Sequence, residues 1–331
     1  MNTTIWTRAL RHSYIGHALA TLLLVQLLMS CNTGVETPLR VATTPWPGYE
    51  SLHLAQSLHY FDADTIRIVD MVNNNQAAMA VRNGSVNAGM LTLDETLLLL
   101  QDGIDLQVIL VMDISNGADA VIARPEIISL QGLRGKRVAV DNGTVGAVML
   151  DAMLDAANLQ VSDILPVSKP VNEHSHAYLT GQIDAAVTFE PVRSELLKHG
   201  AHILFDSSQI PGRIVDVLVV RTDAISQHRQ ALVKLVAACF KALAYQASQP
   251  RDAAQRIAPY LGIKPDEVPA QYSGLILPTL TDNHSWLAGP SAQLNSTASN
   301  LAKLMLQRHL LQNNPPISHL AQPMFLPANA P

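Results

Sequence analysis

The sequence predicts an α/β protein in which two strand–helix lobes follow one another and a mainly helical third completes the chain. Short β-branched and apolar runs alternate with helical patterns from residue 39 to 112, and the same alternation restarts at residue 121. From residue 224 onward helical patterns dominate. With 331 residues, 48% of them hydrophobic and 15% charged, the chain is long and apolar enough to bury a substantial core.

The first thirty residues form a separate segment. Residues 1–30 include no acidic residue, and two arginines precede an apolar stretch, which is the pattern of a secretory signal. The end of the stretch, Leu28-Met29-Ser30-Cys31, resembles the lipobox of bacterial lipoproteins. This resemblance implies that Cys31 is lipidated and begins the mature chain. The alternative is a buried apolar helix that ends in an ordinary cysteine.

Removal of this segment changes the charge balance. The 22 basic residues fall to 20 against 27 acidic ones, so the mature charge is −7, which argues against a nucleic-acid partner. Residues 31–38 are expected to form a polar tether. Cys239 lies in an apolar helical pattern, and we expect it to be an inert core residue.

The first lobe is predicted from its alternating elements. Strands are expected at residues 39–43, 65–69, 86–91 and 106–112, with helical patterns at 52–58, 76–82 and 95–101. The last of these strands is almost wholly apolar, as expected for a strand that is buried on both faces. The pattern predicts a mostly parallel sheet with helices on both faces.

The second lobe repeats the alternation. Strands are expected at residues 121–123, 137–140, 164–167, 183–188, 202–205 and 214–220, with helices at 145–157, 174–179 and 191–199. Further helices are expected at 224–249, 251–261 and 291–311. We therefore assign residues 39–117 with 218–312 to the first lobe, 118–217 to the second, and 313–331 to an irregular tail.

Ligand sites in such folds lie outside the carboxyl ends of the parallel strands. The segments at these positions are residues 45–49, 92–95, 113–119, 141–146 and 188–191. The motifs in and around them are Trp46-Pro47-Gly48-Tyr49, Asp94-Glu95, Ser115–Ala120, and Glu190-Pro191 after Gly181-x-x-Asp184-Ala185, with Leu130-x-x-Leu133-x-Gly135-Lys136 before the second lobe. In their order and spacing they resemble the substrate-binding proteins of ABC importers for nitrate, sulfonates, taurine and thiamine-pyrimidine precursors.

The resemblance implies a type II periplasmic-binding fold, in which a small molecule is trapped between two lobes that close about two hinge segments. We expect the hinges near residues 117–122 and 216–220. The implied function is that of a lipid-anchored, monomeric solute-binding component on the periplasmic side of a bacterial membrane. It would deliver its ligand to an ABC permease and ATPase complex, without a cofactor and without catalysis. The alternatives are a solute-sensing input protein and a thiamine-pyrimidine synthase, whose cysteine-rich motif the chain lacks.

The first candidate binding residues are aromatic and acidic. Trp46 and Tyr49 can stack on a flat ligand, or Trp46 can pack between helices. Thr92-x-x-Glu95 is a capping box, which explains Glu95 without a ligand. Asp94 can then face the cleft or interact with the helix dipole.

The remaining candidates lie at the predicted crossover and in the second lobe. Ser115 and Asn116 are expected to contact the ligand, although an ordinary crossover turn is the alternative, and Asp119 can instead tie the hinge. Thr144 lies at a helix start that can accept an anion, or it is a plain N-cap. Glu190 meets either a cationic ligand group or only a helix dipole.

The candidate segments supply acidic residues but no arginine or lysine. We therefore expect a ligand with a positively charged or amine-like group beside a planar or anionic part, such as an amino-pyrimidine precursor or taurine. Capping of Asp94, Glu95 and Glu190 would instead leave a neutral cleft. His174 and His176 are two residues apart and do not share a helix face, so we expect no metal site.

Overall fold

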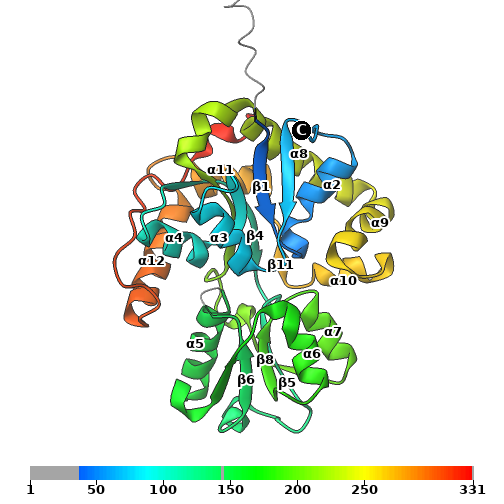
Figure 1. The fold of residues 1–331 in the computed structure, drawn as a ribbon, viewed down its shortest axis with the longest axis vertical. Helices are drawn as coiled ribbons and strands as arrows, with labels where there is room; N and C mark the ends of the chain where they lie inside the picture. Colours follow the sequence, from blue (N-terminus) through cyan, green and yellow to red (C-terminus); the bar gives the residue numbers. More distant parts are fainter. Residues whose placement is uncertain (1–36, 143–144, 330–331) are drawn as a thin grey trace, which may run out of the picture. The chain divides into compact units, whose positions relative to one another are not determined.

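Two mixed β-sheets organise the computed structural model, which describes residues 37–142 and 145–329 (Figure 1). The expected leader and Cys31 lie outside these residues. The strands of the first sheet are, in spatial order, β11 (Leu275–Ile276), β4 (Leu106–Ser115), β10 (Val215–Arg221), β3 (Ala88–Thr92), β1 (Leu39–Thr43) and β2 (Ile66–Asp70). Those of the second sheet are β7 (Leu165–Ser168), β6 (Arg137–Val140), β8 (Ala185–Thr188), β5 (Ala120–Ala123) and β9 (His202–Asp206).

The prediction of mostly parallel sheets is wrong for the strands near the crossovers. β1 runs parallel to β2 and β3, and β6 runs parallel to β7 and β8. β10, however, is antiparallel to β3 and β4, and β5 is antiparallel to β8 and β9. The reason is topological: β4 leaves the first sheet toward the second, and β10 returns across the same edge in the opposite direction.

Helices cover both faces of the first sheet, as the alternation predicts. They are α2 (Ser51–Ser57), α3 (Asn74–Arg82), α4 (Leu93–Gln101), α8 (Ile225–Ser248), α9 (Pro250–Leu261), α10 (Val268–Gln271), α11 (Leu280–Leu287) and α12 (Gln293–Gln307). Figure 1 shows α3 and α4 on one side of the sheet and α2 and α9 on the other. The alternation of β1 explains both cores, because Leu39 and Val41 pack toward α2 and α8 while Ala42 packs toward α3 and α4.

The second sheet has the same layered construction. Its helices are α5 (Val145–Ala157), α6 (His174–Leu179) and α7 (Val192–Lys198). Along β5, Val121 and Ala123 pack toward α5, whereas Ala120 and Ile122 pack toward α6 and α7. Both faces of the strand are therefore buried.

Helix α8 belongs to the core of the first lobe. Together with the turn before it, this is the one helix among residues 37–142 and 145–329 with the length and hydropathy of a membrane span, and 44% of its apolar window is buried inside the protein. Cys239 on this helix is fully buried, and desolvation raises the pKa of its thiol to about 12. Its predicted place in the core is confirmed.

The chain passes between the sheets twice. The first crossing lies between β4 and β5, at residues 116–119, and the second lies between β9 and β10, at residues 207–214. The second crossing thus precedes the segment 216–220 at which we expected a hinge. Ser207 joins the two crossings, since its Oγ lies 2.7 Å from Ser115 Oγ and accepts a hydrogen bond from the Gly117 N–H at 2.6 Å.

A third segment, around Gly274, packs closely against the first crossing. The Asn116 N–H donates to the Gly274 carbonyl at 2.7 Å, and a Cβ on Gly274 would lie 2.6 Å from the Gly117 carbonyl carbon. Glycine is therefore required where the strand β11 approaches the crossover. The tail is mainly irregular, but it is packed. Leu320 and Phe325 are buried, and Ala321 forms an isolated bridge to Val108 of β4.

Candidate ligand-binding cleft

Two buried carboxylates form the centre of the candidate site. Asp113 on β4 and Asp216 on β10 are direct cross-strand partners, so their side chains lie on the same face of the first sheet. Their exposed fractions are 0% and 2%. Two aromatic side chains hold them: the Tyr49 hydroxyl donates to Asp216 Oδ1 at 2.6 Å, and the Trp46 indole N–H donates to Asp113 Oδ2 at 3.0 Å.

The loop after β1 brings these aromatic donors over the carboxylates. Residues Pro47–Tyr49 form a 3₁₀ turn, η1, which proline opens because its fixed φ suits the first helical position. Gly48 lies directly against the acid, since a Cβ at this position would be 1.7 Å from Asp113 Oδ2. Only a residue without a side chain lets the loop approach Asp113 so closely.

The start of α4 adds two further buried acids. Thr92 Oγ1 accepts from the Glu95 N–H, and Glu95 Oε2 accepts from the Thr92 N–H at 3.0 Å, which is the predicted capping box. Asp94 and Glu95 are 2% and 1% exposed. Each keeps one oxygen without a hydrogen-bond partner, Asp94 Oδ2 and Glu95 Oε1. Capping therefore engages only part of this acidic pair.

Asp119 closes the site from the first crossover. Its backbone N–H donates to Ser115 Oγ at 3.2 Å and its carbonyl accepts from the Ser207 N–H at 2.9 Å, so the backbone ties the crossover. Its carboxylate is 3% exposed, and Oδ2 has no partner. A small cavity of about 10 Å³ lies beside it, lined by Trp46, Tyr49, Asn74, Thr92, Asp119, Val145, Phe189, Ile214 and Asp216.

Among the residues that the structure describes, the five buried acids of the site have no cationic partner in an ion pair, and burial disfavours their ionised forms. Desolvation raises the pKa of Asp94, Glu95, Asp113 and Asp216, and it raises the pKa of Asp119 to about 7. Mutual proximity adds to the effect on Asp216, whose pKa the neighbouring Asp113 raises further. Within the described residues no ion pair includes any of these five carboxylates.

One arginine stands at the edge of this acidic group. Arg193 on α7 lowers the pKa of Asp119 through its charge, an effect smaller than that of burial. Its Nη1 pairs with Glu190 Oε1 at 2.8 Å, and its buried Nε has no partner. Glu190 also accepts from the Ser194 N–H and hydroxyl, so its carboxylate is engaged within its own helix start. The expectation of candidate segments without a cationic neighbour thus overlooked Arg193.

A wider cavity of about 260 Å³ adjoins the small one and shares Asn74 and Phe189 with it. Its remaining lining comes from both lobes: Thr44, Pro45, Val72, Asn73, Asp141, Val171, Asn172, Glu190, Pro191, Val192 and Leu261. Phe189 meets the Trp46 ring edge to face, with a centroid distance of 5.5 Å. The Asn75 amide donates to Asp141 Oδ1 at 2.7 Å and thereby joins α3 to the end of β6.

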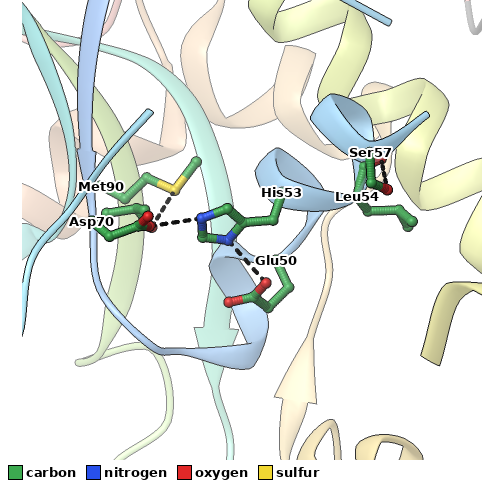
Figure 2. Close-up of polar contacts among 7 residues, drawn as sticks. Glu50, His53, Leu54, Ser57, Asp70 and Met90 are labelled. Carbon is green, nitrogen blue, oxygen red and sulfur yellow. Dashed lines mark hydrogen bonds and ion pairs between the residues drawn. The ribbon is translucent and has the colours of Figure 1, made fainter. Parts of the chain in front are cut away.

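An ionic group supports the loop from behind, in which Glu50 and His53 are buried and Asp70 is exposed (Figure 2). His53 Nδ1 lies 3.0 Å from Glu50 Oε2, and His53 Nε2 lies 2.8 Å from Asp70 Oδ1. Burial opposes the charge on His53, but the hydrogen bonds to Asp70 and Glu50 outweigh it and raise the pKa to about 9. Tyr260 stacks on the ring at 3.9 Å. This group fixes the start of α2 to the end of β2, directly after η1.

The structure separates the predicted site residues into groups. Trp46, Tyr49 and Asp119 line the small cavity, and Glu190 lines the wider one. Ser115 bonds to Ser207 at the crossover instead of lining either cavity, and Asn116 is exposed there.

Two predicted site residues remain, Asp94 and Thr144. Asp94 is buried at the start of α4, and Thr144 lies outside the described residues. Asp113 and Phe189 fall within strand-end segments that the sequence analysis selected, although neither was named as a binding residue, and Asp216 and Asn74 were missed. The sequence does contain a signal for the two carboxylates. Asp113 is the one acid in the apolar strand β4, near its end, and Asp216 is the one acid in the apolar strand β10. Among residues 37–142 and 145–329, no group of three or more metal-ligating side chains is arranged to hold a metal ion.

Known proteins resemble this chain in sequence and in fold. A family model described as NMT1/THI5 like matches residues 46–253. A protein of Brucella abortus (strain 2308) named as a binding protein is 22% identical over 150 residues, which cover 44% of this chain and 47% of the relative; the match thus spans about half of each. A protein of Bacillus subtilis (strain 168) named as an aliphatic sulfonates-binding protein is 30% identical over 121 residues, or 36% of each chain.

The fold also matches solved structures. The periplasmic aliphatic sulphonate binding protein of Escherichia coli superposes with a TM-score of 0.70 at 19% identity, over 87% of this chain and 98% of that one. The predicted type II periplasmic-binding fold is confirmed by this likeness.

Proposed function

The chain belongs to the NMT1/THI5-like family, and from that premise we propose that it is the solute-binding component of an ABC importer. The observation that carries the proposal is the pair of adjoining cavities, whose walls come from both lobes and meet at the crossovers. A ligand held there contacts both sheets, so binding favours the arrangement in which the lobes are closed.

Polar contacts between the lobes support this mode of action. Beside the Asn75–Asp141 hydrogen bond, Arg308, which directly follows α12, pairs with Asp151 of α5 at 3.2 Å and also with Asp155. Lys198 of α7 pairs with Glu267, before α10. Such exposed pairs contribute little stability, about 0–1 kcal/mol each, which suits a closed arrangement that must open again to release its ligand.

Binding of a small solute tests the proposal. The purified full-length chain is titrated in a calorimeter with a panel of small sulfonates, amines, amino-sulfonates and aminopyrimidines. We expect saturable binding of at least one compound at one site per chain, weakened at least tenfold by Trp46→Ala. Trp286→Phe, at a buried tryptophan in α11 that lines neither cavity, should leave the affinity unchanged. A chain that binds no member of the panel would contradict the proposal.

We further propose that the protein is held at the periplasmic side of a bacterial membrane by a lipid on Cys31, where it delivers its solute to a permease and ATPase complex. The basic, acid-free leader and Leu28-Met29-Ser30-Cys31 support the anchor. Cys31→Ser is expected to move the protein from the membrane fraction to the soluble periplasmic fraction. The anchor is refuted if the unaltered protein has no lipid by mass spectrometry.

A further inference from the structure

We propose that the cleft selects an organic cation, with an ammonium or amidinium group held between Asp119 and Asp216 and an uncharged body in the wider cavity. This inference rests on the proposed solute-binding function and names its ligand class. It depends on the charge of the inner cavity, on the nature of its walls and on the size of the two spaces.

The acidic side chains of the inner cavity favour a cation, because a bound cation stabilises the ionised carboxylates that burial alone disfavours. Asp119 and Asp216 line it directly, and Asp113 stands beside Asp216 on the next strand. Asp119 Oδ2 and Asp113 Oδ1 are buried and have no hydrogen-bond partner. A buried acceptor without a donor is costly, by about 1–3 kcal/mol, and a ligand with several N–H groups supplies the missing donors. The opposite charge of such a ligand also offsets the mutual repulsion of the carboxylates.

The two aromatic donors of the inner cavity are already engaged, which disfavours an anion. The Trp46 N–H and the Tyr49 hydroxyl, the groups that could bind a sulfonate oxygen, donate to Asp113 and Asp216. Arg193 pairs with Glu190 and is not among the residues that line either cavity. A sulfonate would therefore meet carboxylates where it needs donors.

The aromatic walls give an independent indication. Trp46, Tyr49 and Phe189 line the same small cavity as the two carboxylates. Aromatic faces attract cations through their quadrupole, and the attraction is strongest where water is excluded. Carboxylates and aromatic rings around one buried space form a site for an organic ammonium group. A metal ion is disfavoured, because within the described residues no cluster is arranged to ligate one.

The sizes of the two cavities define the shape of the ligand. The inner cavity, of about 10 Å³, has room for one group of the size of a water molecule, which is the size of an ammonium head. The outer cavity of about 260 Å³ shares Asn74 and Phe189 with it, so the body of the ligand can continue past these two residues. Asparagine side chains at 73, 74 and 172 in its wall provide uncharged donors and acceptors for this body.

Size-matched probes of different charge test the inference. Benzylammonium, benzyl alcohol and benzenesulfonate are titrated into the full-length chain by calorimetry, and butylammonium, 1-butanol and butanesulfonate repeat the comparison without a ring. We expect an ammonium compound to bind at least tenfold more tightly than its alcohol, and the sulfonates not to bind. Asp216→Asn and Asp119→Asn should each weaken ammonium binding at least tenfold, whereas Asp223→Asn, at an exposed acid, should not.

The variants and outcomes separate this inference from the proposed function. Asp119→Asn keeps the backbone bonds of the crossover, so it provides the test even if Asp216→Asn fails to fold. The inference is overturned if both ammonium compounds fail to bind, or if their binding is unaffected by both substitutions. Binding of a sulfonate or an alcohol in preference to the ammonium compound would overturn the cation selectivity and leave the solute-binding function standing. Failure of every compound in the wider panel would overturn the function as well.

Discussion

A methyl group added to Gly48 provides a sharp test of the loop over the carboxylate pair. In Gly48→Ala the new Cβ would lie 1.7 Å from Asp113 Oδ2 and 2.4 Å from its Cγ, so the carboxylate must move. Overpacking of this kind costs about 1–3 kcal/mol, and loss of the Trp46–Asp113 hydrogen bond to a charged group adds about 1.5–3 kcal/mol. We expect a total destabilisation of about 4 kcal/mol.

The assay is a double-mutant cycle with Asp113→Ala. Denaturant unfolding of the four variants gives the free energy of unfolding for each, and the coupling between the two positions follows from their differences. Removal of the Asp113 carboxylate eliminates the two shortest contacts of the new methyl group, whereas the contact to Trp46 Nε1 at 2.8 Å remains. Gly48→Ala should therefore cost about 1–2 kcal/mol in the Asp113→Ala background, less than in the unaltered protein. An equal cost in both backgrounds would refute the described packing of Gly48 against Asp113.

Three further predictions concern charge. Replacement of His53 by Ala leaves Glu50 buried without its partner and should cost about 3–5 kcal/mol by denaturant unfolding. In the unaltered protein the His53 pKa is about 9 against an ordinary 6.5, so the stabilisation by His53 should be complete below pH 6.5 and disappear as the pH rises through 9, and an NMR titration of the ring checks this pKa. The pKa of Asp119 rises from 3.8 to about 7 on folding, so this group binds a proton more tightly in the folded state. The free energy of unfolding of the ligand-free protein should therefore fall by about 4 kcal/mol between pH 4 and a pH above 7, and a series of denaturation curves should show a flatter pH profile for Asp119→Asn. The double variant Arg308→Ala, Lys198→Ala removes ion pairs between the lobes and should change the free energy of unfolding by less than about 2 kcal/mol. It should nevertheless enlarge the radius of gyration measured by small-angle scattering. An unchanged radius would show that these pairs do not hold the lobes together.

Local features of the site could be predicted from the sequence, because short-range patterns encode them. The Thr92–Glu95 capping box spans four residues, and the structure contains both of its hydrogen bonds. Trp46, Tyr49 and Asp119 follow predicted strand ends, and the rule that ligands bind there places them at a cavity. The Arg193–Glu190 pair, three residues apart on a helix start, could have been predicted from spacing as well.

The centre of the site could not be predicted in this way. Asp113 and Asp216 are more than a hundred residues apart, and they meet only because β10 runs antiparallel to β4 in one particular register. A single sequence determines neither the direction of a strand that returns from another lobe nor its register. Ser115 and Asn116 were placed correctly at the crossover, but whether such a residue faces a ligand or a neighbouring segment depends on Ser207 and Gly274, which approach from elsewhere in the chain.

The fluorescence of Trp46 gives the most direct test of ligand binding between the lobes. Trp46 lines the inner cavity, whereas Trp286 is buried in α11 within the other core of the first lobe. A solute that binds by calorimetry should change the tryptophan emission saturably and with the same affinity in the unaltered protein and in Trp286→Phe, and the change should vanish in Trp46→Phe. A calorimetric ligand that leaves the emission of Trp286→Phe unchanged would contradict a binding site at the Asp113–Asp216 pair.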